Sequence, residues 1–209
     1  MGEYERSRKR SSWLRPLTLG TLVVGVTAAA VGTLGLACDR HPSAQPAPQR
    51  SSPDLSYLCR HRDVPDRAWR YIVIHHSATV GGGAATFERY HIGVRGWDSL
   101  AYHFVIGNGT QTGDGEIEVG SRWPEQRGGP GAGALEYNEW GIAICLVGDF
   151  SKQRPTRPQM RSLHALVRYL MQRYDIAPNN VLGHGECPGA ATECPGRNFP
   201  MEEFRRSLR

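Results

Sequence analysis

The sequence contains few cysteines, almost no lysine and no large excess of either charge. Five cysteines among 209 residues are too few for a small fold held together by a dense set of disulfides. Lysine occurs twice against 23 arginines, a bias to which we attach no function. Hydrophobic residues make up 39 % of the chain, a share that excludes disorder throughout and also excludes a protein with many membrane spans.

The net charge of +5 is concentrated near the N-terminus. Residues 1–15 hold five basic and two acidic side chains, a net charge of +3, whereas the chain from Cys38 onward holds 20 basic and 18 acidic ones, a net charge of +2. A nucleic-acid-binding domain needs its basic residues clustered on the folded part of the chain. The distribution therefore predicts no nucleic-acid partner.

The basic segment is followed by a run of 21 residues without charge, 17–37. This order is typical of a secretory signal, and the run is also long enough to span a bilayer. The sequence GLAC at 35–38 resembles a bacterial lipoprotein box, in which Cys38 would carry the lipid. We therefore predict that 1–37 is a signal peptide or membrane anchor and that the protein is exported to the cell envelope. Lipid at Cys38, an uncleaved anchor and simple secretion remain as alternatives.

Residues 38–56 are rich in proline, serine, alanine and glutamine and predict an extended linker. The remainder, 57–209, has the length of a single domain. Apolar, β-branched runs predict strands over 70–75, 101–106, 116–119, 141–147 and 181–182. Helices are predicted over 86–94 with Thr86 as N-cap, over 156–174 with Thr156 and Pro158 at its start, and over 201–208. The expected class is α/β, a mixed central β-sheet flanked by helices.

Three residues of this domain have side chains that bind transition metals. His75 ends the first predicted strand, His184 lies in a glycine-rich loop, and Cys194 follows ten residues later. Two imidazoles and a thiolate would leave one position of a tetrahedral zinc site for water, whose pKa the metal lowers towards neutrality. On spacing alone, packed histidines and a buried thiol are the favoured interpretation of the pattern.

Four sequence blocks in a fixed order carry a resemblance to a known family. They are IVIHHSAT from residue 72, GWDSLAYHFVIGNG from 96, YNEWGIAICLVGDF from 137, and LGHGE from 182 with TECPG from 192. Together they resemble the zinc N-acetylmuramoyl-L-alanine amidases, a family that includes phage amidases, bacterial type 2 amidases and peptidoglycan recognition proteins. The resemblance runs from Tyr71 to Pro195.

The resemblance implies a fold, a cofactor and a reaction. His75, His184 and Cys194 match the zinc ligands of the family, and Tyr102 and Thr192 match positions that assist catalysis. The implied reaction is hydrolysis of the amide between N-acetylmuramic acid and L-alanine, with peptidoglycan or muropeptides as partner. The implied fold is a single amidase-like domain, which we expect to be a monomer. The alternative is a non-catalytic module of the same fold that only binds peptidoglycan.

The chain also departs from the family pattern. The stretch between His184 and Cys194 is two residues longer than is common and contains Cys187, a rival thiol ligand. Gly133 stands where the family often has a histidine. Glu186 is a candidate proton donor, although support of the metal site is the favoured role for it.

The remaining candidates have structural interpretations. We expect His76, His103, Trp97 and the buried thiol of Cys145 to pack, and Asn138 to form a turn. His91 lies either at the surface or in a groove. Cys59 and Cys187 can pair in an oxidising compartment, but their spacing does not establish a disulfide.

Overall fold

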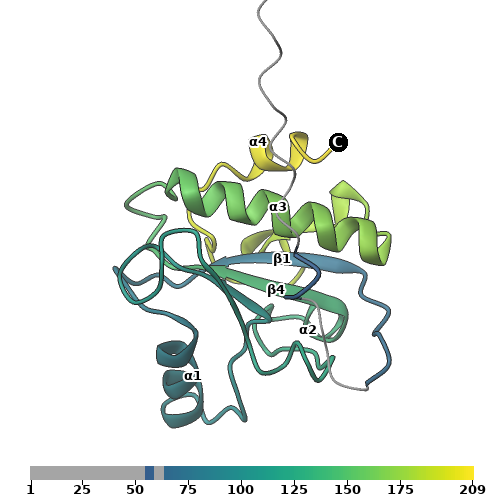
Figure 1. Cartoon of the computed structure of the whole chain (residues 1–209), viewed down its shortest axis with the longest axis horizontal. Helices are drawn as coiled ribbons and strands as arrows, with labels where there is room; N and C mark the ends of the chain where they lie inside the picture. The colour runs from purple at the N-terminus through teal and green to yellow at the C-terminus, as the bar shows by residue number, and fades with distance from the viewer. Residues whose placement is uncertain (1–54, 59–63) are drawn as a thin grey trace, which may run out of the picture. The chain divides into compact units, whose positions relative to one another are not determined.

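The computed structural model describes residues 55–58 and 64–209, which form a five-stranded mixed sheet with helices on both faces (Figure 1). The strand order is β3-β2-β4-β1-β5. Strands β2, β4, β1 and β5 run parallel, and β3 pairs antiparallel with β2. The strands are β1 (Tyr71–His76), β2 (Phe104–Ile106), β3 (Ile117–Val119), β4 (Gly141–Leu146) and β5 (Val181–Gly183). The predicted α/β class is confirmed.

The two central strands are apolar along their length because both faces of the sheet are covered. All six residues of β4 are buried, and so are the four inner residues of β1. Along β1, Ile72 and Ile74 belong to the large core cluster on one face, whereas Val73 packs in a smaller cluster on the other. Since side chains alternate along a strand, His75 points to the same face as Val73.

The long helix α3 (Arg157–Tyr174) covers the Ile72 and Ile74 face, as its apolar period predicts. Its buried stripe consists of Leu163, Leu166, Val167 and Leu170. Thr156 is the N-cap and forms a capping box with Gln159, as the predicted start of the helix requires. The helix ends where Asp175 adopts a left-handed conformation with φ of 53°. Helix α4 (Met201–Arg206) lies over α3 (Figure 1).

One local prediction is wrong, and one helix was missed. Helix α1 (Ala84–Gly93) begins after Gly83, so Thr86 lies inside its first turn and is not the N-cap. The Thr86 hydroxyl instead donates to Gln111 Oε1 at 2.6 Å. Helix α2 (Leu135–Trp140) was not predicted, because six residues with no buried side chain show no apolar period. Short 3-10 helices occupy Pro178–Asn180 and His184–Glu186.

The predicted targeting segment 1–37 and most of the linker lie outside the described residues. Within the described ranges, no helix is both long and apolar enough to cross a membrane. Residues Gln49–Arg209 form one compact unit, and the described core clusters lie entirely within it. This unit therefore has its own hydrophobic core.

The capping box of α3 leads to a stability prediction. Replacing Thr156 with Ala should lower the free energy of unfolding by about 1 kcal/mol, because the Gln159 amide loses its acceptor. Urea unfolding followed by circular dichroism measures the change. The Thr86→Ala variant is the matched control, and its effect should stay within about 0.5 kcal/mol. Equal losses in both variants would contradict the assignment of Thr156 as the cap.

Candidate metal centre

The candidate centre lies at the carboxyl edge of the parallel strands. His75 is the fifth residue of β1, and His184 directly follows β5. Ile74 pairs in register with Gly183, so the two histidines leave adjacent strands at the same level. The loop after β5 returns Cys194 to this edge, where its thiol accepts the backbone N–H of His76 at 3.4 Å.

The structure brings the three predicted ligands together. The ligand atoms of His75, His184 and Cys194 all lie within 4.8 Å of one another. His75 Nδ1 is 3.9 Å from Cys194 Sγ, and the two imidazole centroids are 4.7 Å apart. Ligand atoms around a tetrahedral zinc are separated by about 3.3–3.8 Å. The donor set and its spacing therefore fit a zinc ion with small side-chain adjustments.

The protonation states of the centre suit cation binding. Burial, and then the neighbouring His184, hold the pKa of His75 well below its usual value, so this imidazole is neutral and has a lone pair to offer. Burial also lowers the pKa of His184. The pKa of the Cys194 thiol is raised to about 12, again mainly by burial. A bound cation would take the place of that thiol proton, since a coordinating thiol is deprotonated.

The loop that carries Cys194 is held close to the 3-10 helix at His184. The Gly185 amide donates to the Cys194 carbonyl at 2.6 Å, and the Cys194 amide donates to the Thr192 hydroxyl at 3.1 Å. A Cβ at Gly185 would lie 2.4 Å from the Thr192 carbonyl oxygen, so the two segments approach closely only because residue 185 is glycine. The longer loop is thus accommodated without displacing Cys194 from the two histidines.

A groove of about 440 Å³ opens over the centre. Tyr102 and Thr192, the predicted catalytic residues, both line it together with the three metal-binding side chains. The Tyr102 ring lies 5.3 Å from the His75 ring. Burial raises the pKa of Tyr102 well above its usual value, so the phenol stays protonated and acts as a hydrogen-bond donor.

One wall of the groove comes from helix α1 and the segment after it. His91, whose position the sequence left open, is buried in this wall and its Nδ1 accepts the Ala101 amide at 3.2 Å. Trp97 packs on His91 with ring centroids 4.8 Å apart, as predicted, and it also lines the groove. The Arg95 guanidinium lies 4.9 Å from the centre of the Trp97 ring.

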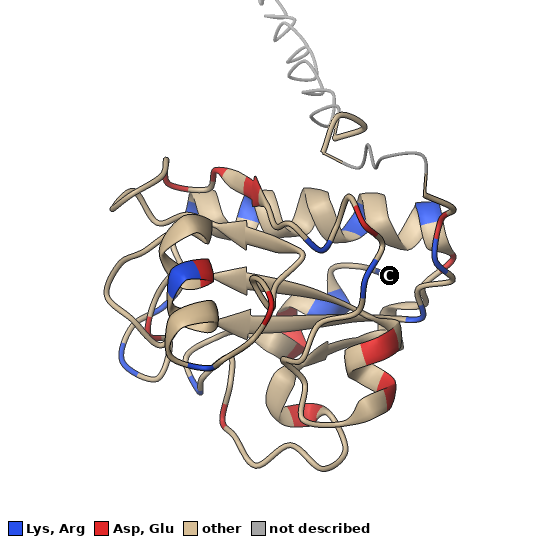
Figure 2. Cartoon of the chain, turned by 90° about the horizontal axis from the view of Figure 1, so that it is seen from below, with Lys and Arg blue, Asp and Glu red and all other residues tan. Residues whose placement is uncertain are grey.

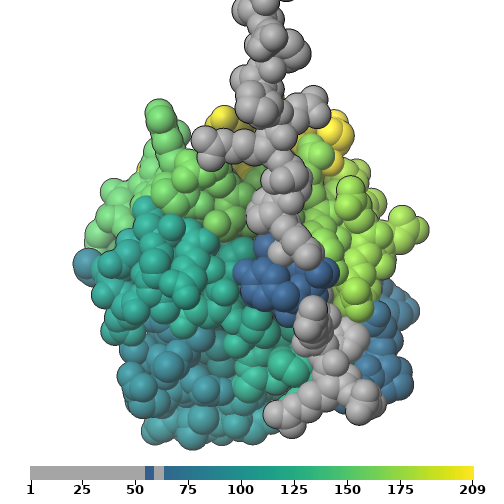
Figure 3. All heavy atoms as spheres, in the orientation of Figure 1, coloured from purple at the N-terminus to yellow at the C-terminus, as the bar shows by residue number. Residues whose placement is uncertain are grey.

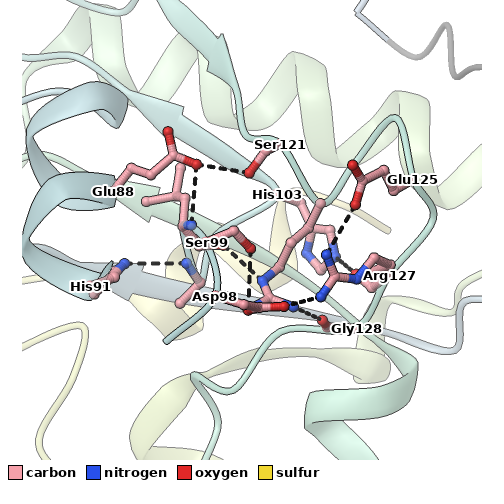
Figure 4. Close-up of polar contacts among 12 residues, drawn as sticks. Glu88, His91, Asp98, Ser99, His103, Ser121, Glu125, Arg127 and Gly128 are labelled. Carbon is pink, nitrogen blue, oxygen red and sulfur yellow. Dashed lines mark hydrogen bonds and ion pairs between the residues drawn. The ribbon is translucent and has the colours of Figure 1, made fainter. Parts of the chain in front are cut away.

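A polar network behind this wall fixes its loops (Figure 4). Asp98 forms ion pairs with Arg127 and Arg122, and the hydrogen bond from Arg127, together with Arg122, lowers the pKa of its carboxyl group. Arg122, whose side chain is buried, also donates to the carbonyl oxygens of Leu100 and Gly128, each at 2.8 Å. Sequence reasoning missed this network because its partners come from loops more than 20 residues apart.

His103 was expected to pack, and in the structure it connects the network to the sheet. Its Nδ1 accepts the Ala143 amide and its Nε2 bonds the Arg127 carbonyl oxygen, both at 2.8 Å. The imidazole is fully buried, and burial lowers its pKa to about 4. Both ring nitrogens are used only when the ring is neutral, because Nδ1 must accept.

This buried histidine predicts a pH dependence of stability. Its folded pKa of about 4 lies below an unfolded value of about 6.5, so the stabilisation is present above pH 6.5 and is lost as the pH falls towards 4. The contribution of His103 should be about 3 kcal/mol over that range. Urea unfolding at several pH values measures it, and His103→Gln should reduce the pH dependence by the share that His103 contributes. A slope unchanged in His103→Gln would contradict the prediction.

The structure separates the remaining candidates from the centre. Cys187 is a buried free thiol that packs against Val73 and Ala132 and donates to the Gly183 carbonyl oxygen, so it is not part of the cluster. Its suggested partner Cys59 lies outside the described residues. Glu186 accepts the Gly183 amide at 2.7 Å and pairs with Arg205 at 2.5 Å, which directs its carboxylate to α4.

Other predictions for single residues have mixed outcomes. Cys145 is a buried thiol within β4, as predicted, and His76 packs on Phe150 and accepts its amide. Asn138 is not in a turn but in α2, where its side chain accepts the Ala132 amide at 2.7 Å and holds the loop before the helix. Gly133 lines the groove without a side chain.

The fold and the site define an α/β domain with a His, His and Cys cluster at the floor of a groove. The family model for N-acetylmuramoyl-L-alanine amidase matches residues 65–197. The chain belongs to this family, as the sequence blocks implied.

Similar proteins include both amidases and peptidoglycan recognition proteins. The chain is 28 % identical over 161 residues to a Sus scrofa N-acetylmuramoyl-L-alanine amidase, a match that covers 72 % of this chain and 24 % of the relative. It is 30 % identical over 139 residues to peptidoglycan-recognition protein SC2 of Drosophila simulans, covering 62 % of this chain and 69 % of the relative. The chain thus spans only about a quarter of the porcine protein.

Solved structures give the same two groups. The amidase LysC from Clostridium intestinale URNW superposes with a TM-score of 0.58 at 34 % identity, over 69 % of this chain and 90 % of LysC. Peptidoglycan recognition protein LE, solved in complex with tracheal cytotoxin, a monomeric diaminopimelic acid-type peptidoglycan, gives 0.54 at 27 % identity over 72 % of this chain and 89 % of that chain. The predicted single-domain amidase-like fold is confirmed.

Proposed function

We propose that the protein is a zinc-dependent amidase that hydrolyses the bond between N-acetylmuramic acid and L-alanine in peptidoglycan. The observation that carries the proposal is the cluster of His75, His184 and Cys194 at the floor of an open groove, with ligand atoms within 4.8 Å of one another. Membership of the amidase family supports the choice of substrate bond.

The zinc ion, when bound, would supply an activated water and polarise the substrate carbonyl group. The chain's own residues would stabilise the charge that then develops on the carbonyl oxygen. Tyr102 is the donor for this role, since its partly buried phenol is protonated and its ring lies beside that of His75. Thr192 lines the same groove and orients Cys194 through its hydroxyl. Glu186 would hold the loop in place, because its carboxylate is committed to Gly183 and Arg205.

The proposal also includes the localisation of the protein. A basic segment, a charge-free run and Cys38 support export and attachment to a membrane, with a linker that lets the domain reach the cell wall. We further propose that the protein acts as a monomer, because the three metal-binding side chains and Tyr102 already lie together within one protomer.

Digestion of purified sacculi tests the activity. The Gln49–Arg209 unit should release stem peptides with new L-alanine amino termini, detected by mass spectrometry. A chelator should abolish the release and added zinc should restore it. The peptidoglycan recognition proteins among the relatives make binding without turnover the second candidate. Sedimentation with sacculi that produces no new amino termini in the presence of zinc would favour that candidate and reject the amidase.

A further inference from the structure

A second and larger groove lies on the opposite side of the sheet from the metal centre. It has a volume of about 1050 Å³ and runs between α3 and α4. Helix α3 packs on the Ile72 and Ile74 face, whereas His75 points to the other face. Nothing in the proposed reaction uses this groove.

The rim of this groove is basic. Arg154, Arg157, Arg161 and Arg168 line it, and their spacing of three, four and seven residues places them along one side of α3 and its approach. Figure 2 shows basic positions at several points along this helix. Arg157 and Arg168 are about 16 Å apart along the helix. None of the four forms an ion pair within the described part of the chain, and Glu203 is the one acidic residue of the lining. Like charges at this spacing repel each other, so the stripe favours an anionic partner.

The floor of the groove is apolar. Met160, Ala165 and Tyr169 of α3 face Phe204 of α4 across it. A polyanion that is charged along its whole length has no apolar group to pack against this floor. An amphiphile with an anionic head and a hydrocarbon tail matches both the rim and the floor.

The position of Leu55 indicates that a membrane is the source of such an amphiphile. Leu55, the first described residue, lines this groove, and residues 55–58 lie beside α3 (Figure 3). Seventeen residues, 38–54, separate it from the charge-free run that we predict to reach a membrane. A linker of this length spans at most about 60 Å when extended. Leu55, at the described end of the predicted linker, therefore lies on the face that carries the arginines.

We propose that the arginine-rimmed groove between α3 and α4 binds an anionic phospholipid surface, with lipid phosphates on the arginines. The proposal builds on the proposed membrane attachment but is independent of the amidase activity. The bilayer contact would orient the domain, because the metal centre lies on the other face of the sheet. The groove over the metal centre would then face away from the membrane, where the cell wall lies.

Vesicle sedimentation of the Gln49–Arg209 unit tests the proposal without the predicted anchor. The unit should bind vesicles of phosphatidylcholine mixed with phosphatidylglycerol, should not bind phosphatidylcholine alone, and should be released by high salt. The double variant Arg157→Gln with Arg161→Gln should bind about 30-fold more weakly, since each arginine near an anionic surface contributes about fivefold.

The matched control is Arg89→Gln with Arg197→Gln, which removes the same charge from exposed positions outside the groove. It should bind like the wild type. Equal weakening in both double variants would show a general charge effect and overturn the proposal. Binding to soluble polyphosphate but not to the mixed vesicles would overturn it as well. Sacculus digestion by the same variants should be unchanged, which separates this proposal from the amidase.

Discussion

Replacing His75 or Cys194 with Ala should abolish the release of stem peptides from sacculi. Each side chain supplies one of the three ligand atoms of the cluster, and the two approach each other to 3.9 Å. Loss of one ligand removes the metal that activates water and polarises the carbonyl, an effect of several kcal/mol. We expect activity to fall at least about 10³-fold. Mass spectrometry of digested sacculi measures activity, and elemental analysis of the purified protein measures zinc.

The neighbouring thiol provides the matched control for this experiment. Cys187 lies in the same loop and is buried, but it packs away from the cluster. Cys187→Ala should therefore keep both its zinc and its activity. Because an alanine at 194 can also weaken folding, Cys194→Ser should be tested beside it, with circular dichroism to show that the fold is retained. A well-folded Cys194→Ser protein with wild-type activity would reject the metal centre.

Replacing Tyr102 with Phe should lower kcat by about 10²–10³-fold, the usual effect of removing one donor to a developing oxyanion. The phenol lines the groove and is partly buried, and it stays protonated because desolvation raises its pKa. The loss should therefore be constant from neutral to mildly alkaline pH. Zinc content and KM should change little, since Tyr102 is not a ligand and acts on the transition state.

Tyr71→Phe is the control for this substitution. It removes a hydroxyl from the same strand that carries His75, but that hydroxyl bonds Glu136 at the surface. Its activity should equal that of the wild type. A Tyr102→Phe protein with full activity would exclude the phenol as the donor. Loss of zinc from the Tyr102→Phe protein would instead show that Tyr102 has a structural role in the metal centre.

Much of the fold was predictable because it depends on short stretches of sequence. The apolar runs of β1 and β4 and the period of α3 identified these elements, and Thr156 with Pro158 placed the start of α3. Prediction failed where the local signal was weak. Helix α2 has only six residues, and the first turn of α1 starts after a glycine without a side-chain cap. In both cases contacts with distant segments select the helix.

The candidate metal centre was likewise predictable only in part. The residue types His75, His184 and Cys194 and their order could be recognised in the sequence, but their proximity depends on the register of β1 with β5 and on the loop that returns Cys194. Residues 75 and 194 are 119 positions apart, so no local pattern specifies their 3.9 Å contact. The structure also decided that Cys187 lies outside the cluster and that His91 is buried in the groove wall.

The sequence by itself determined the family, the chemical character of the candidate ligands and the class of the fold. Only the tertiary structure showed that the ligands meet on one face of the sheet and that a basic groove lies on the other. The physical reason is that helix capping and side-chain period act over a few residues, whereas strand order, register and the closure of a groove depend on contacts between segments far apart in the chain.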